Sequence, residues 1–427
     1  MILSKFAKDT TTYKMRIAII GAGAAGCFAA INIKRKAADA EITVFESGRK
    51  PLAKVAVTGG GRCNITNSFE HVKSMAAVYP RGHRLMERLF HMFDNKDTCR
   101  WFEAEGVRFV TQEDGCVFPK SQDAMEIVGT LARLMNNMGI RLITGHRITR
   151  IEKAGNDNGN GFRIYAGDSE TPYYTDIAVV TTGGCPKAGM LDMLAPIGVK
   201  TVSPVPSLFG LCLPGDNITA LTGTVVENAS VAIAGTKHRA EGDLLITHRG
   251  VSGPAILRLS SYAARTLHDN DYRVKLTINW MGAASEAEVQ EELYAMAAQN
   301  PQKQISNIYP TRLNARLWTH LLLRCGIKPE QRWSELARKS YNKLTNVLTN
   351  STFDVDGRNK FKEEFVTCGG VALSNVNPNT LECKSCPGLF FAGEVLDVDA
   401  LTGGFNLQAA WTMGYVVAEK NNFSAEL

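Results

Sequence analysis

Three glycines near the start of the chain constrain its fold more than any other feature. They lie in the run Gly21-Ala-Gly-Ala-Ala-Gly26, which directly follows an apolar segment at 15–20 and opens an Ala-rich helical pattern at 24–38. A G-x-G-x-x-G run between a strand and a helix is the fingerprint of a βαβ unit that binds a dinucleotide. A second strand pattern at 41–45 completes such a unit. The sequence therefore predicts a Rossmann-type α/β fold.

Each residue type in this unit has a physical role. Gly21 permits the tight turn, Gly23 lets the backbone approach a pyrophosphate, and Gly26 lets the helix pack closely on the strand. The free N–H groups of the helix N-terminus then face the phosphates. Glu46 ends the second strand, and its carboxylate is expected to accept hydrogen bonds from the ribose hydroxyls of an adenosine half. A 2′-phosphate is disfavoured there, because two anions would meet.

Two later segments point to the same edge of the sheet. In 58–67 three consecutive glycines precede Arg62 and Asn64, and such a run favours close approach of the backbone to a ligand over regular structure. A flexible loop is the alternative. Near the C-terminus a buried strand pattern ends in Gly393-Glu394, and Gly403-Gly404 opens a helix. The positive end of that helix would stabilise negative charge on a reduced flavin.

These segments together predict FAD, bound non-covalently, as the ligand. The residues expected to contact it are Gly21, Gly23, Ala24, Ala25, Gly26, Glu46, Ser47, Thr58, Gly59, Gly60, Gly61, Arg62, Cys63, Asn64, Thr182, Gly183, Gly184, Gly393, Glu394, Asp399, Gly403, Gly404, Phe405 and Asn406.

The chain resembles the BaiN-like family of bacterial NAD(P)/FAD-dependent oxidoreductases. The motifs GAGAAG, GGGRCNxTN, THxGxSGPAxL, TxGGV and GLxFAGEVLDVDxxTGGxN recur in order at 21–26, 59–67, 247–257, 367–371 and 388–406. The resemblance implies FAD in the Rossmann domain, an inserted β-barrel and a helical cap, and it adds Ile148 to the expected contacts. Members are linked to steroid or bile-acid ring reduction and to amine oxidation. One departure is 380–386, where relatives usually have TMESK.

The expected fold class is α/β, with a Rossmann-type FAD-binding domain interrupted by an inserted β-barrel-like domain that carries a helical subdomain. Three prolines in 196–206 mark the change from alternating strands and helices to short strands. The expected segments are a tail at 1–14, the FAD-binding domain at 15–200 and 366–427, the inserted β domain at 201–283 and 348–365, and the helical subdomain at 284–347.

The motif at 247–257 supplies the one candidate proton donor, His248. Histidine side chains exchange protons near neutral pH. Ser252 is expected to cap a helix, with Pro254 in its first turn. The alternative, that this segment only packs the insert onto the FAD-binding domain, is favoured. No Ser-His-Asp, metal-ligand or paired-thiol arrangement accompanies it, since the lone pair Cys383 and Cys386 lacks the second pair that zinc requires.

The main functional prediction is an FAD-dependent oxidoreductase that transfers hydride between the flavin and a small organic substrate, such as an enone or a steroid. NAD(P)H would bind transiently as donor, since a second G-x-G-x-x-G is absent. An oxidase of small amines, an RNA-modifying flavoprotein and a non-catalytic redox sensor are the alternatives. The net charge of +6 shows no obvious basic block with interleaved aromatics, which argues against nucleic acid. Ten cysteines, the lack of an export signal and the lack of a long apolar stretch favour the cytoplasm and no membrane contact.

Overall fold

The computed structural model describes residues 14–154, 161–185, 189–359 and 366–423. They divide into two compact units, with boundaries at 204/205, 368/369 and around 400–402. We call them the Rossmann unit (up to 204, 369–399 and from 403) and the barrel unit (205–368 with 400–402). The expected tail at 1–14 lies outside the described residues except for Lys14.

A five-stranded parallel sheet forms the centre of the Rossmann unit, in the order β19-β10-β1-β2-β6. Its strands are β1 (Arg16–Ile20), β2 (Glu41–Glu46), β6 (Arg141–Thr144), β10 (Ile177–Val180) and β19 (Leu389–Phe391). β10 and β19 are buried throughout, as expected when both faces of a parallel sheet are covered. The C-terminal strand therefore returns to the sheet that the N-terminus begins.

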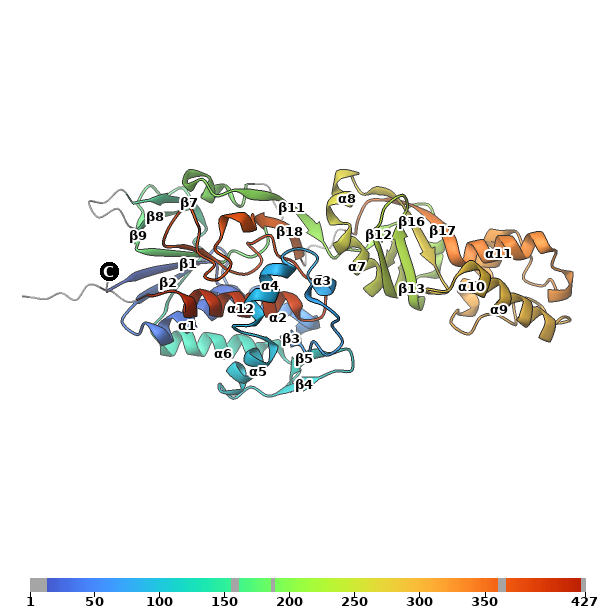
Figure 1. The fold of residues 1–427 in the computed structure, drawn as a ribbon, viewed down its shortest axis with the longest axis horizontal. Coiled ribbons are helices and arrows are strands. Elements are labelled where there is room, and N and C mark those ends of the chain that lie inside the picture. Colours follow the sequence, from blue (N-terminus) through green and yellow to red (C-terminus); the bar gives the residue numbers. More distant parts are fainter. Residues whose placement is uncertain (1–13, 155–160, 186–188, 360–365, 424–427) are drawn as a thin grey trace, which may run out of the picture. The chain divides into compact units, whose positions relative to one another are not determined.

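Different elements cover the two faces of this sheet (Figure 1). The helices of one face are α1 (Ala24–Lys36), α6 (Ala124–Asn137) and α12 (Phe405–Lys420). The other face carries an antiparallel meander of β7 (Ile148–Lys153), β8 (Phe162–Ala166) and β9 (Tyr173–Thr175). The ring of Tyr173 lies 4.9 Å from that of Phe45, which packs the meander on β2.

The long connection between β2 and β6 holds most of the smaller elements. They are α2 (Ala53–Gly61), α3 (Met75–Val78), α4 (His83–Phe90), α5 (Asn95–Glu103) and the three-stranded sheet of β3 (Thr66–Asn67), β4 (Phe109–Thr111) and β5 (Cys116–Pro119). Two 3₁₀ helices, η1 (Asp192–Ile197) and η4 (Leu373–Asn375), also belong to this unit. A separate two-stranded sheet pairs β11 (Thr201–Ser207) with β18 (Val366–Val371).

The barrel unit is built on a six-stranded antiparallel sheet. Its strands, in spatial order, are β12 (Leu211–Cys212), β15 (Gly250–Ser252), β14 (Arg239–Thr247), β13 (Val225–Ile233), β16 (Arg273–Asn279) and β17 (Ser351–Asp356). The two edges meet, because Leu211 bridges Arg358 and the Cys212 N–H donates to the Gly357 carbonyl at 3.0 Å. The sheet is therefore nearly a closed barrel, which leaves little unpaired edge.

Helices complete the barrel unit. They are α7 (Pro254–Tyr262), α8 (Ala264–Asp269), α9 (Glu286–Gln299), α10 (Ala315–Cys325) and α11 (Arg338–Asn350), with 3₁₀ helices η2 (Asn217–Leu221) and η3 (Trp333–Glu335). Trp318 and Trp333 of the helical part share one hydrophobic core with Ile278 and Phe353 of the sheet. Nowhere in the described residues is a helix both long and apolar enough to cross a membrane.

The expected α/β class, a Rossmann-type fold with a barrel-like insert, is confirmed. The finer division into six segments stays a prediction. The expected cap of α7 is wrong: Ser252 ends β15, and Gly253 precedes the helix without a side-chain cap. Gly253 has φ +89°, and a Cβ there would lie 2.8 Å from the Asp243 carbonyl oxygen. The chain thus turns between strand and helix with a backbone that only glycine adopts easily.

The contact between α1 and α12 gives a test of how helices pack in the Rossmann unit. A Cβ on Gly414 would lie 2.9 Å from the Ala25 carbonyl oxygen and 3.2 Å from the Ala29 nitrogen. We expect Gly414→Ala to lower the free energy of unfolding in urea by about 1–3 kcal/mol, because backbone must move. The control is Gly129→Ala in α6, where a Cβ would meet no atom within 4 Å. This substitution should raise the free energy of unfolding by about 0.5–1 kcal/mol. Equal stability of the two variants would contradict the close packing of α12 on α1 at Gly414.

Candidate functional site

The turn after β1 is fixed by backbone contacts that exclude side chains. Gly21 has φ +112°, and a Cβ there would lie 2.4 Å from the Thr181 carbonyl oxygen. A Cβ on Gly26 would lie 2.0 Å from the Gly21 carbonyl oxygen. The Thr181 hydroxyl donates to the carbonyls of Ile20 and Gly21 at 3.1 and 2.8 Å. The turn is therefore held between β1, β10 and the start of α1.

Gly23 differs from Gly21 and Gly26, because neither its backbone conformation nor a neighbouring protein atom requires a glycine at this position. Its φ of −86° suits any residue, and a Cβ there would meet no protein atom within 4 Å. The space lies at the N-terminus of α1, whose first turn has no acidic side chain. Free N–H groups and the positive end of the helix favour an anion at such a place. The residues present therefore fit a pyrophosphate group.

Glu46 lies beside this turn at the carboxyl end of β2. One carboxylate oxygen accepts from the Ala22 N–H at 2.9 Å. The other accepts from the Gly48 N–H at 2.7 Å and from the Ser47 hydroxyl at 3.2 Å. An ionised carboxylate has about four acceptor positions. The side chain is thus oriented by the backbone and keeps capacity for the hydroxyls of a ribose.

The glycine run at the end of α2 leaves backbone uncovered. Thr58 has ψ 148°, which ends the helical backbone, and Gly59, Gly60 and Gly61 follow with φ between +59° and +86°. A Cβ on Gly59 would lie 2.8 Å from the Asn64 nitrogen, whereas at Gly60 and Gly61 nothing lies within 4 Å. Gly60 and Gly61 therefore present bare backbone to open space, as a loop that contacts a flat or anionic ligand requires.

Arg62 holds this loop rather than extending from it. Its guanidinium lies 4.3 Å from the centre of the Phe118 ring and donates to the Gly59 carbonyl at 3.1 Å. A weaker bond reaches Gln122 at 3.4 Å. A direct contact of Arg62 with FAD stays a prediction.

Three side chains fix the start of α12. With its amide oriented to satisfy its neighbours, Asn64 accepts from the Gly404 N–H at 3.1 Å. Asn67 donates to the Gly403 carbonyl at 3.0 Å, and the Tyr79 hydroxyl donates to the Phe405 carbonyl at 2.9 Å. Gly404 has φ +88°, and a Cβ there would lie 2.2 Å from the Thr66 carbonyl oxygen. The positive end of α12 is thus held in one place.

A buried polar chain lies under the same helix. Gln408 accepts from the hydroxyls of Thr66 and Thr98 at 2.6 and 3.0 Å, and it donates to Thr412 at 3.0 Å. Thr412 in turn donates to the Phe93 carbonyl at 2.9 Å. Every hydroxyl in this series of hydrogen bonds has a partner, so the series costs little to bury. It also fixes the rotation of α12 about its axis.

Sequence reasoning missed several of these positioning residues. Asn67 could have been found, because it ends the glycine-rich motif at 58–67. Tyr79, Arg81 and Gln408 follow no recognisable spacing. Arg81 forms a buried bidentate ion pair with Asp399, whose side chain is fully buried. Asp399 was expected to contact FAD; in the structure its carboxylate binds Arg81 and anchors the loop before α12.

The remaining expected contacts lie at the same edge of the sheet or close to it. Thr182, Gly183 and Gly184 follow β10, and a Cβ on Gly183 would lie 3.9 Å from a Glu394 carboxylate oxygen. Glu394 pairs with Lys54 at 3.4 Å. Ile148 is buried at the start of β7. The contacts of these residues with FAD stay predictions.

His248 lies apart from these loops in the chain. It is exposed in the two-residue turn between β14 and β15 of the barrel unit. Its role as a proton donor stays a prediction.

The three cysteines considered in the sequence analysis are buried. Cys63, in the glycine-rich loop, is buried, and burial raises the pKa of its thiol to about 12, with the Thr58 hydrogen bond opposing part of that rise. Cys383 and Cys386 are buried as well. Among the residues that the structure describes, no group of His, Cys, Asp and Glu has the arrangement of a metal site.

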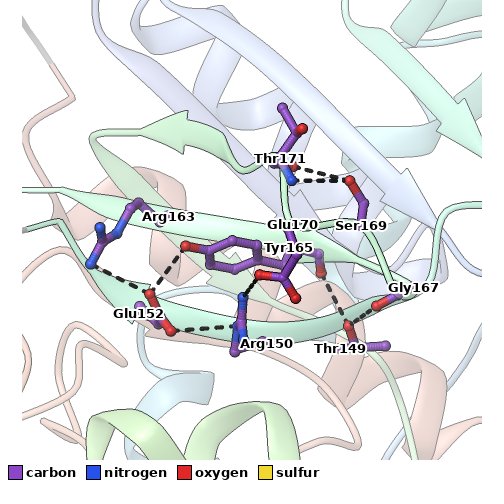
Figure 2. Close-up of polar contacts among 9 residues, drawn as sticks. All are labelled: Thr149, Arg150, Glu152, Arg163, Tyr165, Gly167, Ser169, Glu170 and Thr171. Carbon is purple, nitrogen blue, oxygen red and sulfur yellow. Dashed lines mark hydrogen bonds and ion pairs between the residues drawn. The ribbon is translucent and has the colours of Figure 1, made fainter.

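A separate polar cluster on β7 and β8 is internally neutralised (Figure 2). The Arg150 guanidinium lies 3.9 Å from the centre of the Tyr165 ring and binds Glu170 at 3.1 Å. Glu152 accepts from the Tyr165 hydroxyl at 3.2 Å and pairs with Arg163 at 3.4 Å. These charges pair with one another, so the cluster ties the β7–β8 ribbon to the turn after it.

Comparison with known proteins places this chain in a family. Residues 15–420 match the family model described as the HI0933-like protein Rossmann domain. The chain belongs to this family. It is a family of FAD-dependent oxidoreductases with a Rossmann fold that binds FAD. The expected cofactor and broad enzyme class are therefore confirmed at family level.

Curated relatives span nearly the whole chain. One is the 3-dehydro-bile acid delta(4,6)-reductase of Clostridium scindens, 27% identical over 94% of this chain and 97% of the relative. Another is the ribosomal RNA dihydrouridine synthase of Haemophilus influenzae, 27% identical over 94% and 96%. The solved 3-ketosteroid-delta4-(5alpha)-dehydrogenase of Rhodococcus jostii is 15% identical over 96% of this chain and 98% of that one, with a TM-score of 0.49. That last likeness does not bear on the substrate.

Gly23 gives the sharpest test of the pyrophosphate position. We expect Gly23→Ala to weaken FAD binding at least about tenfold, or about 1.4 kcal/mol, because the new methyl group enters the open space at the start of α1. Its thermal stability without FAD should equal that of the wild type. Titration of the flavin-free protein, followed by fluorescence, measures the affinity. Gly26→Ala is the contrasting variant and should destabilise the flavin-free fold itself. An FAD affinity of Gly23→Ala equal to that of the wild type would refute the placement of the pyrophosphate at the start of α1.

Proposed function

We propose that this protein is an FAD-dependent reductase that saturates a carbon–carbon double bond conjugated to a carbonyl group. The observation that carries the proposal is the start of α12, a positive helix end held by Asn64, Asn67 and Tyr79. Such an end favours negative charge on a neighbouring group, and a reduced flavin ring carries that charge. Cys63 in the neighbouring glycine-rich loop is buried, and burial raises the pKa of its thiol, so the flavin remains the reactive centre.

The names of two relatives support the same chemistry. A 3-dehydro-bile acid delta(4,6)-reductase and a dihydrouridine synthase act on different molecules. Both names describe the saturation of a carbon–carbon double bond. In a 3-oxo steroid ring and in uracil that double bond is conjugated to a carbonyl group. A reductase for conjugated double bonds therefore accounts for both relatives with one reaction.

The chain's own residues have positioning roles in this reaction. When bound, FAD would supply the hydride for this reaction, and a proton donor would complete the addition across the double bond. Glu46 and the turn at Gly21–Gly26 would hold the adenosine and pyrophosphate, and the Arg81–Asp399 pair would keep the loop before α12 in place. His248 is the candidate donor of the proton. NAD(P)H is proposed as the transient source of electrons.

Anaerobic mixing tests the proposal. We expect NADH or NADPH to bleach the flavin absorption of the purified protein, and a cyclic enone added without oxygen to restore it. Mass spectrometry should then find the saturated ketone in an amount equal to the flavin oxidised. Flavin that is reduced by small amines and reoxidised only by oxygen would contradict a reductase and favour an oxidase.

Single substitutions separate flavin chemistry from thiol chemistry. Cys63→Ser and Cys383→Ser should retain FAD and keep turnover, because both thiols are buried and do not act as nucleophiles. His248→Ala should leave flavin reduction by NAD(P)H unchanged and slow the oxidative half-reaction by a factor of about 10²–10⁴. Stopped-flow absorbance follows the two half-reactions separately. Loss of turnover in a cysteine variant that still holds FAD would overturn the flavin-only account.

A further inference from the structure

Ser252 in the barrel unit has a hydroxyl group that the fold does not use. The residue ends β15, and the chain turns at Gly253 into α7, whose start receives no side-chain cap. The side chain of Ser252 is half-buried, and its hydroxyl has no hydrogen-bond partner within the part of the chain that the structure describes. A hydroxyl group donates one hydrogen bond and accepts others. The motif at 247–257 therefore presents a hydroxyl that is available to a ligand.

Asn359 carries a second unused donor, and it is deeply buried. Its side chain is 7% exposed, and its backbone N–H donates to the Gly210 carbonyl at 2.9 Å. The side-chain oxygen accepts from the Cys212 thiol at 3.4 Å. Among the residues that the structure describes, none accepts a hydrogen bond from the side-chain nitrogen. Buried polar groups are usually hydrogen-bonded, so an unpaired nitrogen at this position needs a physical reason.

The two side chains lie in one row across three adjacent segments of the sheet. β12 pairs with β15 on one side, and on the other side its Leu211 bridges Arg358. Gly210, the residue before Leu211, therefore lies between Ser252 and Asn359. A Cβ on Gly210 would lie 2.6 Å from the Asn359 amide nitrogen and 3.3 Å from the Ser252 Cβ. The missing side chain of Gly210 thus makes room for the amide, and the amide and the hydroxyl border the same space.

This row faces away from the hydrophobic core of the barrel unit. Leu211 and Val251 are fully buried members of that core, and successive side chains along a strand point to opposite faces of a sheet. Gly210 precedes Leu211 and Ser252 follows Val251, so both belong to the other face. The sheet therefore separates the hydroxyl and the amide from the core, and a ligand that binds them displaces no core side chain.

The thiol of Cys212 determines which way the amide is turned. Burial raises the pKa of this thiol, the Arg249 guanidinium opposes part of the rise, and Asp356 adds to it. The thiol therefore keeps its proton near neutral pH and donates it to the Asn359 oxygen. The amide nitrogen, which can only donate, then lies on the side of Gly210. The fold thus holds an N–H donor in a fixed direction before any ligand binds.

We propose that Ser252 and Asn359 bind the carbonyl oxygen of the substrate whose conjugated double bond this enzyme reduces. The inference rests on the proposed function and assigns recognition of the carbonyl group to the barrel unit. A carbonyl oxygen has two lone pairs, and a hydroxyl and an amide nitrogen supply one donor for each. When a hydride adds to the carbon of the double bond farther from the carbonyl, an electron pair moves to this oxygen, and a proton added to the nearer carbon completes the saturated product. Donors that are already in place stabilise the negative charge on the oxygen.

Binding is tested with the FAD-loaded protein and 4-nitrophenolate, whose negative oxygen imitates the charge that develops on the substrate. Ser252→Ala and Asn359→Asp should each bind it at least about tenfold more weakly than the wild type, because each variant loses a donor to a charged oxygen. Ser252→Thr keeps the hydroxyl and should recover most of the affinity. The matched control is Ser230→Ala, which changes a half-buried serine on β13 of the same sheet and should bind like the wild type. Titration followed by absorbance measures the affinity, and FAD content and thermal melting check the fold.

A second arm follows the reaction itself by stopped-flow absorbance. Reoxidation of the reduced protein by a small cyclic enone should slow by a factor of about 10²–10³ in Ser252→Ala and in Asn359→Asp. Reduction of the flavin by NADPH should keep its wild-type rate in both variants, because the carbonyl oxygen of the enone takes no part in that step. If Asn359→Asp does not fold, the comparison of Ser252→Ala with Ser252→Thr decides.

The two arms separate failure of the inference from failure of the proposed function. No binding of 4-nitrophenolate by the wild type, or equal binding by the wild type and Ser252→Ala, would overturn the inference. Reduction of the enone by Ser252→Ala at the wild-type rate would overturn it as well and would leave the proposed function standing. If the wild type binds 4-nitrophenolate through Ser252 and Asn359 but reduces no enone, the oxygen-binding site stands and the proposed function fails.

Discussion

The whole site depends on a contact that only backbone can make. Gly21 approaches the Thr181 carbonyl, and Gly26 approaches the Gly21 carbonyl, so closely that neither position has room for a Cβ atom. This contact seats α1 against β1 and β10 and aims the helix N-terminus at the carboxyl edge of the sheet. Glu46 ends β2, the glycine run lies at the end of α2 in the connection after β2, and residues 182–184 follow β10. All three therefore lie at the same edge of the sheet. The sheet therefore sets the position of the candidate site before any side chain acts.

Polar side chains supply the second requirement, which is a fixed start for α12. A buried polar group without a partner costs more than a hydrogen bond returns, typically about 1–3 kcal/mol against about 1 kcal/mol. The chain from Thr66 through Gln408 to Phe93 satisfies its members, and the Arg81–Asp399 pair neutralises a fully buried carboxylate. Removing one partner would leave the other unpaired. These groups therefore oppose displacement of the helix more strongly than their net contribution to stability indicates.

Local signals in the sequence located the parts of the fold that follow from local physics. The glycine turn, the acid that ends β2 and the Gly-Glu strand end were predicted, because each depends on a few neighbouring residues. The closure of the barrel at Leu211 and Arg358, and the pairing of Arg81 with Asp399, join residues far apart in the chain and have no local pattern. Ser252 was expected to cap α7 on residue preference, but the tight turn at Gly253 decided the geometry.

The central claim is that the turn after β1 and Glu46 hold the adenosine half of FAD. The most direct measurement compares the affinities of FAD and FMN for the flavin-free wild type and for Glu46→Gln. FMN lacks the adenosine half, so the wild type should bind FAD at least about tenfold more tightly, which corresponds to about 1.4 kcal/mol. Glu46→Gln should lower the affinity for FAD and leave that for FMN unchanged. Equal affinities for the two flavins in the wild type, or an equal loss for both in Glu46→Gln, would contradict the account.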